Sequence, residues 1–149
     1  MRVRLRPHHL LCFFGFRGLG YSPAFVDNMT RLAGLFFSRG RASFELVLGP
    51  DDVCAACPHL KGKGCSNGSD AAVRARDRAV LGLLRLKTRS RLGATALRKR
   101  VLKCVSVEEL RRVCTGCGWL ARGYCEEGLA RRPSQSNSLL TSLGTSFSK

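Results

Sequence analysis

Residues 22–37 read SPAFVDNMTRLAGLFF, and this stretch decides how the first half of the chain folds. Ser22 is a favoured N-cap residue and Pro23 suits the first helical position, so we expect a helix that begins here and runs to about Phe37. Its apolar side chains recur at helical spacing and form a wide stripe, made of Phe25, Val26, Met29, Leu32, Ala33, Phe36 and Phe37. The stretch therefore predicts a helix with one side buried in the core.

Segments with the alternation of β-strands lie on both sides of this helix. Residues 2–6 (Arg-Val-Arg-Leu-Arg) precede it, and residues 43–48 (Ser-Phe-Glu-Leu-Val-Leu) follow it. Strands that flank a helix predict a β-α-β unit with a parallel pair. Further helices are expected at about 71–86 and 94–103, and a capping box at Ser106 and Glu109 predicts a short helix that leads to Cys114. We expect an α+β fold: one mostly helical domain with a short two-stranded sheet.

A duplicated cysteine pattern is the strongest chemical signal in the chain. The pattern C-x2-C-x7-C occurs twice, at Cys54, Cys57 and Cys65 and again at Cys114, Cys117 and Cys125. Thiolates bind zinc and iron–sulfur clusters, and a C-x2-C pair presents two sulfurs to one centre from a tight turn. A disulfide framework needs no duplicated spacing, and a redox dithiol normally uses a single motif, so both are weaker alternatives. We expect two cysteine-rich loops that bind metal.

Two further cysteines and three histidines are candidates for completing these sites. Cys12 lies near His8 and His9 and is the leading extra ligand, whereas Cys104 ends a basic helix and is equally well explained as a buried thiol. Two triplets and two single cysteines would suffice for two four-cysteine centres. The histidines, including His59, could ligate zinc or support the ligands of a cluster. The spacing accepts zinc as well as iron–sulfur, and it leaves the cluster type open.

Motifs around the triplets resemble one family of proteins. They are residues 6–12 (Arg-Pro-His-His-Leu-Leu-Cys), 15–23 (Gly-Phe-Arg-Gly-Leu-Gly-Tyr-Ser-Pro), 49–58 (Gly-Pro-Asp-Asp-Val-Cys-Ala-Ala-Cys-Pro) and 114–117 (Cys-Thr-Gly-Cys). Over roughly residues 6–130 the chain resembles the domain of unknown function 1284 family, small bacterial and archaeal proteins described as iron–sulfur binding, with no assigned reaction. The resemblance implies that the family's cysteine positions are Cys12, Cys54, Cys57, Cys65, Cys114, Cys117 and Cys125. Cys104 lies outside that set, which argues against two all-cysteine clusters.

These observations lead to one functional hypothesis and one alternative. We expect an iron–sulfur protein with a structural or electron-transfer role and a redox or protein partner that the sequence does not identify. The alternative is a structural zinc protein with a basic interaction surface. The sequence shows no catalytic acid–base pair, nucleophile triad or phosphate loop, so we lean against an enzyme.

The charge is strongly positive, with 26 Lys and Arg against 10 Asp and Glu and a net charge of +16. A basic balance of this size suits nucleic acid or an acidic protein partner. The weakly supported nucleic-acid candidates are Arg98, Lys99, Arg100 and Lys103, in a segment that is poor in the aromatic side chains on which bases stack. A solvated helical face is the simpler interpretation of these residues.

Compartment and domain limits complete the predictions. No window approaches the roughly 20 apolar residues of a membrane helix, so we expect no membrane association and a cytoplasmic protein. The basic, acid-free N-terminus keeps organellar import open as an alternative. Residues 1–132 are expected to form the cysteine-rich domain, and residues 133–149, rich in Ser and Thr, a disordered tail.

Overall fold

A three-stranded sheet and six α-helices make up most of the structure, a computed structural model that describes residues 1–117 and 120–130. The tail predicted at 133–149 lies outside the described residues. The α-helices are α1 (Pro7–Gly15), α2 (Pro23–Phe37), α3 (Asp70–Leu84), α4 (Ala94–Cys104), α5 (Val107–Val113) and α6 (Tyr124–Ala130). The α+β class expected from the sequence is confirmed.

The main sheet confirms the parallel pair predicted around α2. Strand β1 (Arg2–Leu5) runs parallel to β2 (Ser43–Leu46), with Arg2 opposite Ser43 and Leu5 opposite Leu46. A third strand, β5 (Arg91–Gly93), adds to the other side of β2 in the antiparallel direction. The two-stranded prediction did not include it, because three residues are too few to show a period of two.

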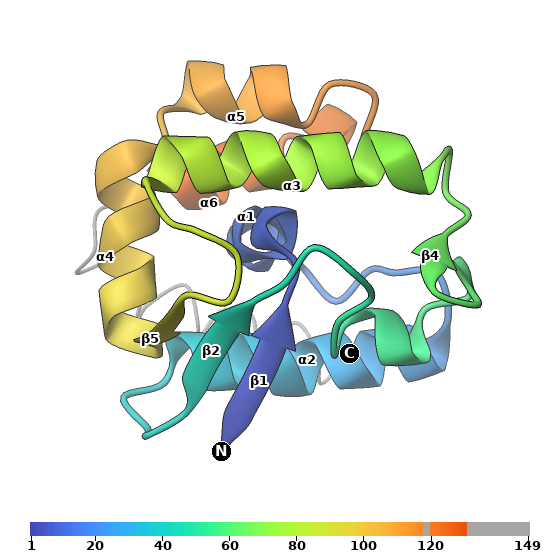
Figure 1. Cartoon of the computed structure of the whole chain (residues 1–149), viewed down its shortest axis with the longest axis horizontal. Helices are drawn as coiled ribbons and strands as arrows, with labels where there is room; N and C mark the ends of the chain where they lie inside the picture. The colour runs from blue at the N-terminus through green and yellow to red at the C-terminus, as the bar shows by residue number, and fades with distance from the viewer. Residues whose placement is uncertain (118–119, 131–149) are drawn as a thin grey trace.

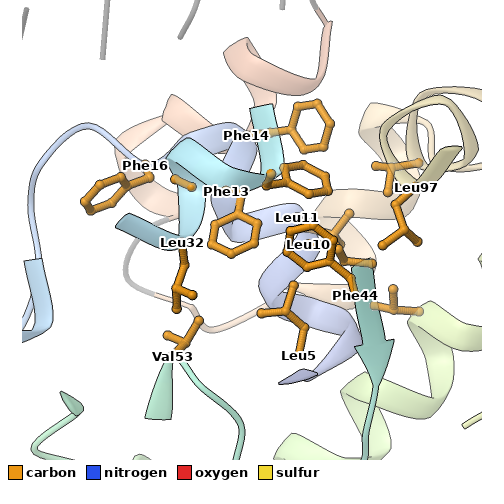
Figure 2. Packing of buried hydrophobic residues seen from close by; sticks show 14 of the residues in the cluster. Leu5, Leu10, Leu11, Phe13, Phe14, Phe16, Leu32, Phe44, Val53 and Leu97 are labelled. Carbon is orange, nitrogen blue, oxygen red and sulfur yellow. The ribbon is translucent and has the colours of Figure 1, made fainter. Parts of the chain in front are cut away.

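Helix α1 occupies the middle of the molecule. In Figure 1 it lies between α3 and α2, with the sheet beside it and with α5 and α6 on the side of α3. Phe13, Phe14 and Phe16 are fully buried, and the ring of Phe36 from α2 contacts Phe13 and Phe14 at centroid distances of 5.1 and 5.7 Å. Figure 2 shows this cluster reaching from Phe16 past Phe13 and Phe14 to Phe44 and Leu97. The C-terminal end of the apolar stripe predicted for α2 thus packs on α1, and the helix also lies against α4.

Two glycines let the backbones of α1 and α6 approach each other closely. A Cβ atom at Gly15 would overlap Cys125 Sγ and would lie 2.7 Å from the Cα atom of Cys125. A Cβ atom at Gly128 would overlap the carbonyl oxygen of Phe14. Side chains larger than hydrogen therefore do not fit at these two points. Because of this contact, Cys125 lies directly against the helix that carries Cys12.

The boundaries of the other predicted helices agree with the sequence to within one or two residues. Helix α3 ends where Arg85 adopts a left-handed conformation with φ of 55°. At the start of α5, Ser106 and Glu109 form the predicted capping box. A local sequence signal therefore marks where α5 begins, whereas the left-handed arginine that ends α3 is not marked in the sequence.

Candidate metal centre

The two cysteine triplets begin with the same backbone turn. The N–H of Cys57 donates to the carbonyl of Cys54 at 2.9 Å, and the N–H of Cys117 donates to that of Cys114 at the same distance. The same kind of hydrogen bond follows three residues later in both triplets. The N–H of Leu60 donates to the carbonyl of Cys57 at 3.1 Å, and the N–H of Leu120 donates to the carbonyl of Cys117 at 3.2 Å. The duplication seen in the sequence is therefore a structural duplication as well, over the segment C-x2-C-x2-L.

The third cysteine of each triplet lies on a different kind of element. In the first triplet, strands β3 (Leu60–Lys61) and β4 (Gly64–Cys65) form a hairpin that places Cys65 opposite Leu60. In the second triplet, the 3-10 turn η2 (Leu120–Arg122) leads into α6, which carries Cys125 to α1. Equal spacing thus produces two differently built loops.

A cavity of about 340 Å³ lies between these loops and α1. Five of the seven predicted cysteine ligands line it: Cys12, Cys54, Cys57, Cys65 and Cys117. All three histidines, His8, His9 and His59, line it as well. The structure therefore brings the first triplet, Cys12, Cys117 and the histidines to one cavity, although they are far apart in the sequence. Cys114 and Cys125 are buried in the core and do not line it.

Electrostatic interactions link Cys12 to the three cysteines of the second triplet. The pKa of Cys12 is raised well above its usual value, first by burial and then by the sulfurs of Cys125, Cys114 and Cys117. We call these four residues the second set. In the first set, made of Cys54, Cys57 and Cys65, burial raises the pKa of Cys57, and Cys65 adds to the shift. Tyr21 lies between the sets: burial and then the sulfurs of Cys12, Cys117, Cys57 and Cys65 raise its pKa to about 12.

The remaining predicted site residues lie elsewhere or have other roles. Cys104, at the end of α4, packs against the hydrophobic core and is not among the residues that line the cavity. Arg98 donates to the carbonyls of Phe36 and Ser38, and Arg100 donates to the carbonyl of Leu84 at 2.9 Å. These two arginines satisfy free carbonyls at the ends of α2 and α3. Lys99 and Lys103 are exposed on α4.

Asp51 connects His9 to the first set. Its Oδ2 lies 2.6 Å from His9 Nδ1 and accepts the Arg6 N–H at 2.5 Å, while its Oδ1 accepts the Cys54 N–H at 2.9 Å. Burial by itself would raise the pKa of Asp51, but His9 and the two backbone N–H groups lower it to about 2. His9, Asp51 and Cys54 each place one donor atom within 4.8 Å of the other two. A metal ligand held by a buried carboxylate has this arrangement.

Asp77 plays the same part for His8 and also binds Arg6. Its Oδ1 lies 2.6 Å from His8 Nδ1, and its Oδ2 accepts from Arg6 Nε at 2.6 Å. Burial and the neighbouring His9 lower the pKa of His8 to about 4, so its imidazole is neutral at pH 7. Arg6 is 1% exposed and lines the cavity, and among the described residues its Nη2 has no hydrogen-bond partner. A buried guanidinium with a free N–H fits a cavity that holds an anionic group.

The thiols have the wrong acidity for a redox dithiol. Burial raises the pKa of Cys54 and Cys125 to about 12 and that of Cys114 to about 11. A reactive dithiol instead needs a lowered pKa, because the thiolate is the nucleophile. All eight cysteines fall within the described residues, and each is a free thiol there. Neither the disulfide nor the dithiol alternative is therefore favoured by the environment of these residues.

Sequence reasoning missed Arg6, Asp51 and Asp77 as members of the site. Asp77 left a signal, because it falls on the apolar face of α3 between Val73 and Val80, where a charged residue has to find a buried partner. Arg6 precedes the two histidines by one proline and has the sequence pattern of an exposed strand residue. Asp51 gave no signal that separates it from an ordinary turn residue.

Comparison with known proteins gives a family and nothing further. A family model described as "Protein of unknown function (DUF1284)" matches residues 20–123. The chain belongs to the DUF1284 family. The DUF1284 match contains the first triplet together with Cys114 and Cys117, and it leaves Cys12 and Cys125 outside its limits. No curated protein and no solved structure matches the chain.

Membrane insertion finds no support in the helices of this DUF1284 protein. Within residues 1–117 and 120–130, every helix is too short or too polar to cross a lipid bilayer.

Proposed function

We propose that this DUF1284 protein binds an iron–sulfur cluster through the second set, Cys12, Cys114, Cys117 and Cys125, for a structural or electron-transfer role. The observation that carries the proposal is the position of Cys12. It comes from α1, far from the other three in sequence, and the three sulfurs of the second triplet act on it at a buried position. Four thiols from two remote segments make a complete ligand set for a four-thiolate centre.

The surroundings of the cavity suit a negatively charged centre. A cluster held by thiolates carries net negative charge, and on the side of Cys54 the cavity has Arg6 Nη2, a buried N–H donor without a partner among the described residues. Arg76 also lines the cavity, where its charge lowers the pKa of Cys114 against the larger effect of burial. When bound, the cluster would supply one-electron chemistry, and the chain's own residues would hold it and set its charge.

Zinc is the second candidate, and the spacing of the donors makes it the less favoured one. Four thiolates on one zinc ion stand about 3.8 Å apart, from a tetrahedron with bonds of roughly 2.3 Å. In the described part of the chain, the only three donor atoms that gather within 4.8 Å of one another are those of His9, Asp51 and Cys54. No three cysteine sulfurs of the described residues lie that close together, which makes a single zinc ion the less favoured centre.

Anaerobic purification followed by iron, sulfide and zinc analysis tests this function. We expect a brown protein with iron and acid-labile sulfide. Cys12→Ala should lose the cluster of the second set, whereas the matched control Cys104→Ala should keep full iron and sulfide. A colourless protein with stoichiometric zinc would end the cluster proposal, and retention of full iron and sulfide by Cys12→Ala would remove Cys12 from the ligands.

The thiols support a proposal for the location of the protein, and its positive charge supports a proposal for its partners. Free cysteines persist in reducing compartments, so we propose that the protein works in the cytoplasm. A redox or acidic protein partner suits the positive charge, and nucleic acid is the alternative, which should show binding that weakens steeply with salt.

A further inference from the structure

The first set lacks a fourth cysteine. Cys54, Cys57 and Cys65 line the cavity from the first loop, Cys104 packs on the core at the end of α4, and the proposed function assigns Cys12 to the second set although it lines the same cavity. A tetrahedral centre needs one more donor on this side of the cavity. Nitrogen from one of the three histidines is the natural replacement for a missing thiolate.

His9 is placed for this task better than the other two. It is the histidine that has a donor atom within 4.8 Å of both Cys54 Sγ and an oxygen of Asp51. His8 is held in the same manner by Asp77 but is not part of that group. His59 packs its ring edge-on against Tyr21 at 4.4 Å, and its backbone N–H donates to the sulfur of Cys57.

Asp51 is an orienting residue and not the missing ligand. Both of its oxygens already accept hydrogen bonds, one from the Cys54 N–H and the other from the Arg6 N–H and the ring of His9. With Asp51 ionised, a neutral His9 ring donates to it from Nδ1, and Nε2 is then the nitrogen that can bind a metal. A histidine that ligates metal usually donates its other ring N–H to a carboxylate in this way.

We propose that His9 completes the first set through Nε2, which makes a three-cysteine, one-histidine metal site distinct from the four-cysteine site. The inference rests on the proposed function, since it assumes that this cavity holds metal. A neutral imidazole in place of a thiolate leaves the first site one negative charge short of the second. With iron–sulfur centres in both sets, the first should therefore accept an electron more readily than the second.

Pulsed electron paramagnetic resonance on the full chain tests the ligand directly. The anaerobic, iron- and sulfide-loaded protein is reduced with dithionite, once with natural histidine and once with histidine labelled with ¹⁵N. We expect a strongly coupled histidine nitrogen whose signal changes with the isotope. This measurement uses the unaltered chain, so it does not depend on how well a variant folds.

Three variants assign the nitrogen to one residue. His9→Cys supplies a thiolate at the same position and should keep iron and sulfide while losing the nitrogen coupling. His8→Asn and His59→Asn are the matched controls, and both should keep the nitrogen coupling. Absence of histidine coupling in protein with full iron and sulfide, or coupling that survives in His9→Cys, would overturn the proposal.

Failure of the proposed function gives a different result. Protein without iron and sulfide would instead be loaded with zinc, and X-ray absorption at the zinc edge would count its nitrogen and sulfur neighbours. A nitrogen neighbour that disappears in His9→Cys would support the inference even though the cluster is absent. An all-sulfur zinc site would overturn it.

Discussion

At the scale of single residues, the site depends on two buried carboxylates that each hold a histidine. Asp51 and Asp77 are both buried, and each lies 2.6 Å from the Nδ1 atom of its imidazole. Carboxylates are costly to bury, so each is compensated by N–H donors or by a cation. Asp77 is compensated by Arg6, which is itself buried. The Arg-Pro-His-His segment is therefore held by charges on two distant segments.

Asp77→Asn should be strongly destabilising. It would leave Arg6 as a buried cation whose nearest remaining carboxylate, Asp70, is 3.5 Å away and is shared with Arg74. Breaking a buried ion pair from one side costs about 3–5 kcal/mol in unfolding free energy. Chemical denaturation of the metal-loaded protein measures the change.

Asp70→Asn is the matched control for this prediction. The Asp70 side chain is 29% exposed, and an asparagine oxygen at this position can still accept the Cys65 N–H, so weakening its pairs with Arg74 and Arg6 should cost clearly less than the loss of the Asp77 charge. Equal effects of the two substitutions would show that burial of Asp77 does not govern the stability of this segment.

At the scale of elements, periodicity and caps allowed most of the helices to be predicted. The stripe of α2, the N-cap at Ser22 and the capping box at Ser106 are local signals, and each marks its element correctly. The sequence did not reveal strand β5 or the β3–β4 hairpin, because strands of two or three residues show no measurable alternation. Equal cysteine spacing also concealed that one loop ends in a hairpin and the other in α6.

The candidate site was predicted in composition and only partly in arrangement. The duplicated triplets identified six cysteines, and their position on or beside one cavity depends on tertiary packing. We assign four cysteines to the second set and three to the first. This assignment places Cys12 with the second triplet, because α1 contacts α6. No local pattern encodes that contact except the glycines that permit it.

Gly15→Ala should separate α1 from α6. Its new methyl group would overlap Cys125 Sγ and would lie 2.8 Å from the Cys125 N atom, so the backbone has to move. Overpacking of this kind costs about 1–3 kcal/mol. We expect a lower melting temperature and less metal in the second set, measured by thermal unfolding and by iron or zinc analysis.

Gly34→Ala provides the control for this change. Gly34 lies inside α2, and a methyl group there would meet no described atom of another segment within 4 Å, so alanine should stabilise by roughly 0.5–1 kcal/mol. Full metal content and an unchanged melting temperature in Gly15→Ala would show that the close approach of the two helices is not required.

At the scale of the whole molecule, several of the few acidic residues are buried inside the fold. Glu45, Asp51 and Asp77 are all buried among the 10 acids of the chain. The surface is therefore more positive than the composition alone indicates. An anionic partner remains the expectation from this charge, although Arg98 and Arg100 serve mainly to satisfy carbonyl groups.

Metal binding by the whole protein should release protons and weaken as the pH falls. The pKa values of Cys54, Cys114 and Cys125 are raised to about 11 or 12, so at pH 7 these thiols are protonated until a metal displaces the proton. Below pH 7 the protons compete better, and the affinity for zinc should drop by about one log unit per pH unit for each thiol that ligates.

Calorimetric titration with zinc in buffers of different ionisation enthalpy counts the released protons. Cys104→Ala should leave the number of released protons unchanged, while Cys12→Ala should lower that number by about one. An affinity that does not vary with pH would mean that the thiols are not the ligands.

The contact between α1, which carries Cys12, and α6, which carries Cys125, has a consequence for the synthesis of the protein. A ribosome exposes Cys12 long before Cys125, because α2 to α5 lie between them in the sequence. The Cys12 thiol therefore has no partner from the second triplet until the segment from Cys114 to Cys125 has been synthesised. If the second set holds a cluster as proposed, the cluster can be completed only after Cys125 has been added, and a chain that stops before Tyr124 should not retain a cluster there.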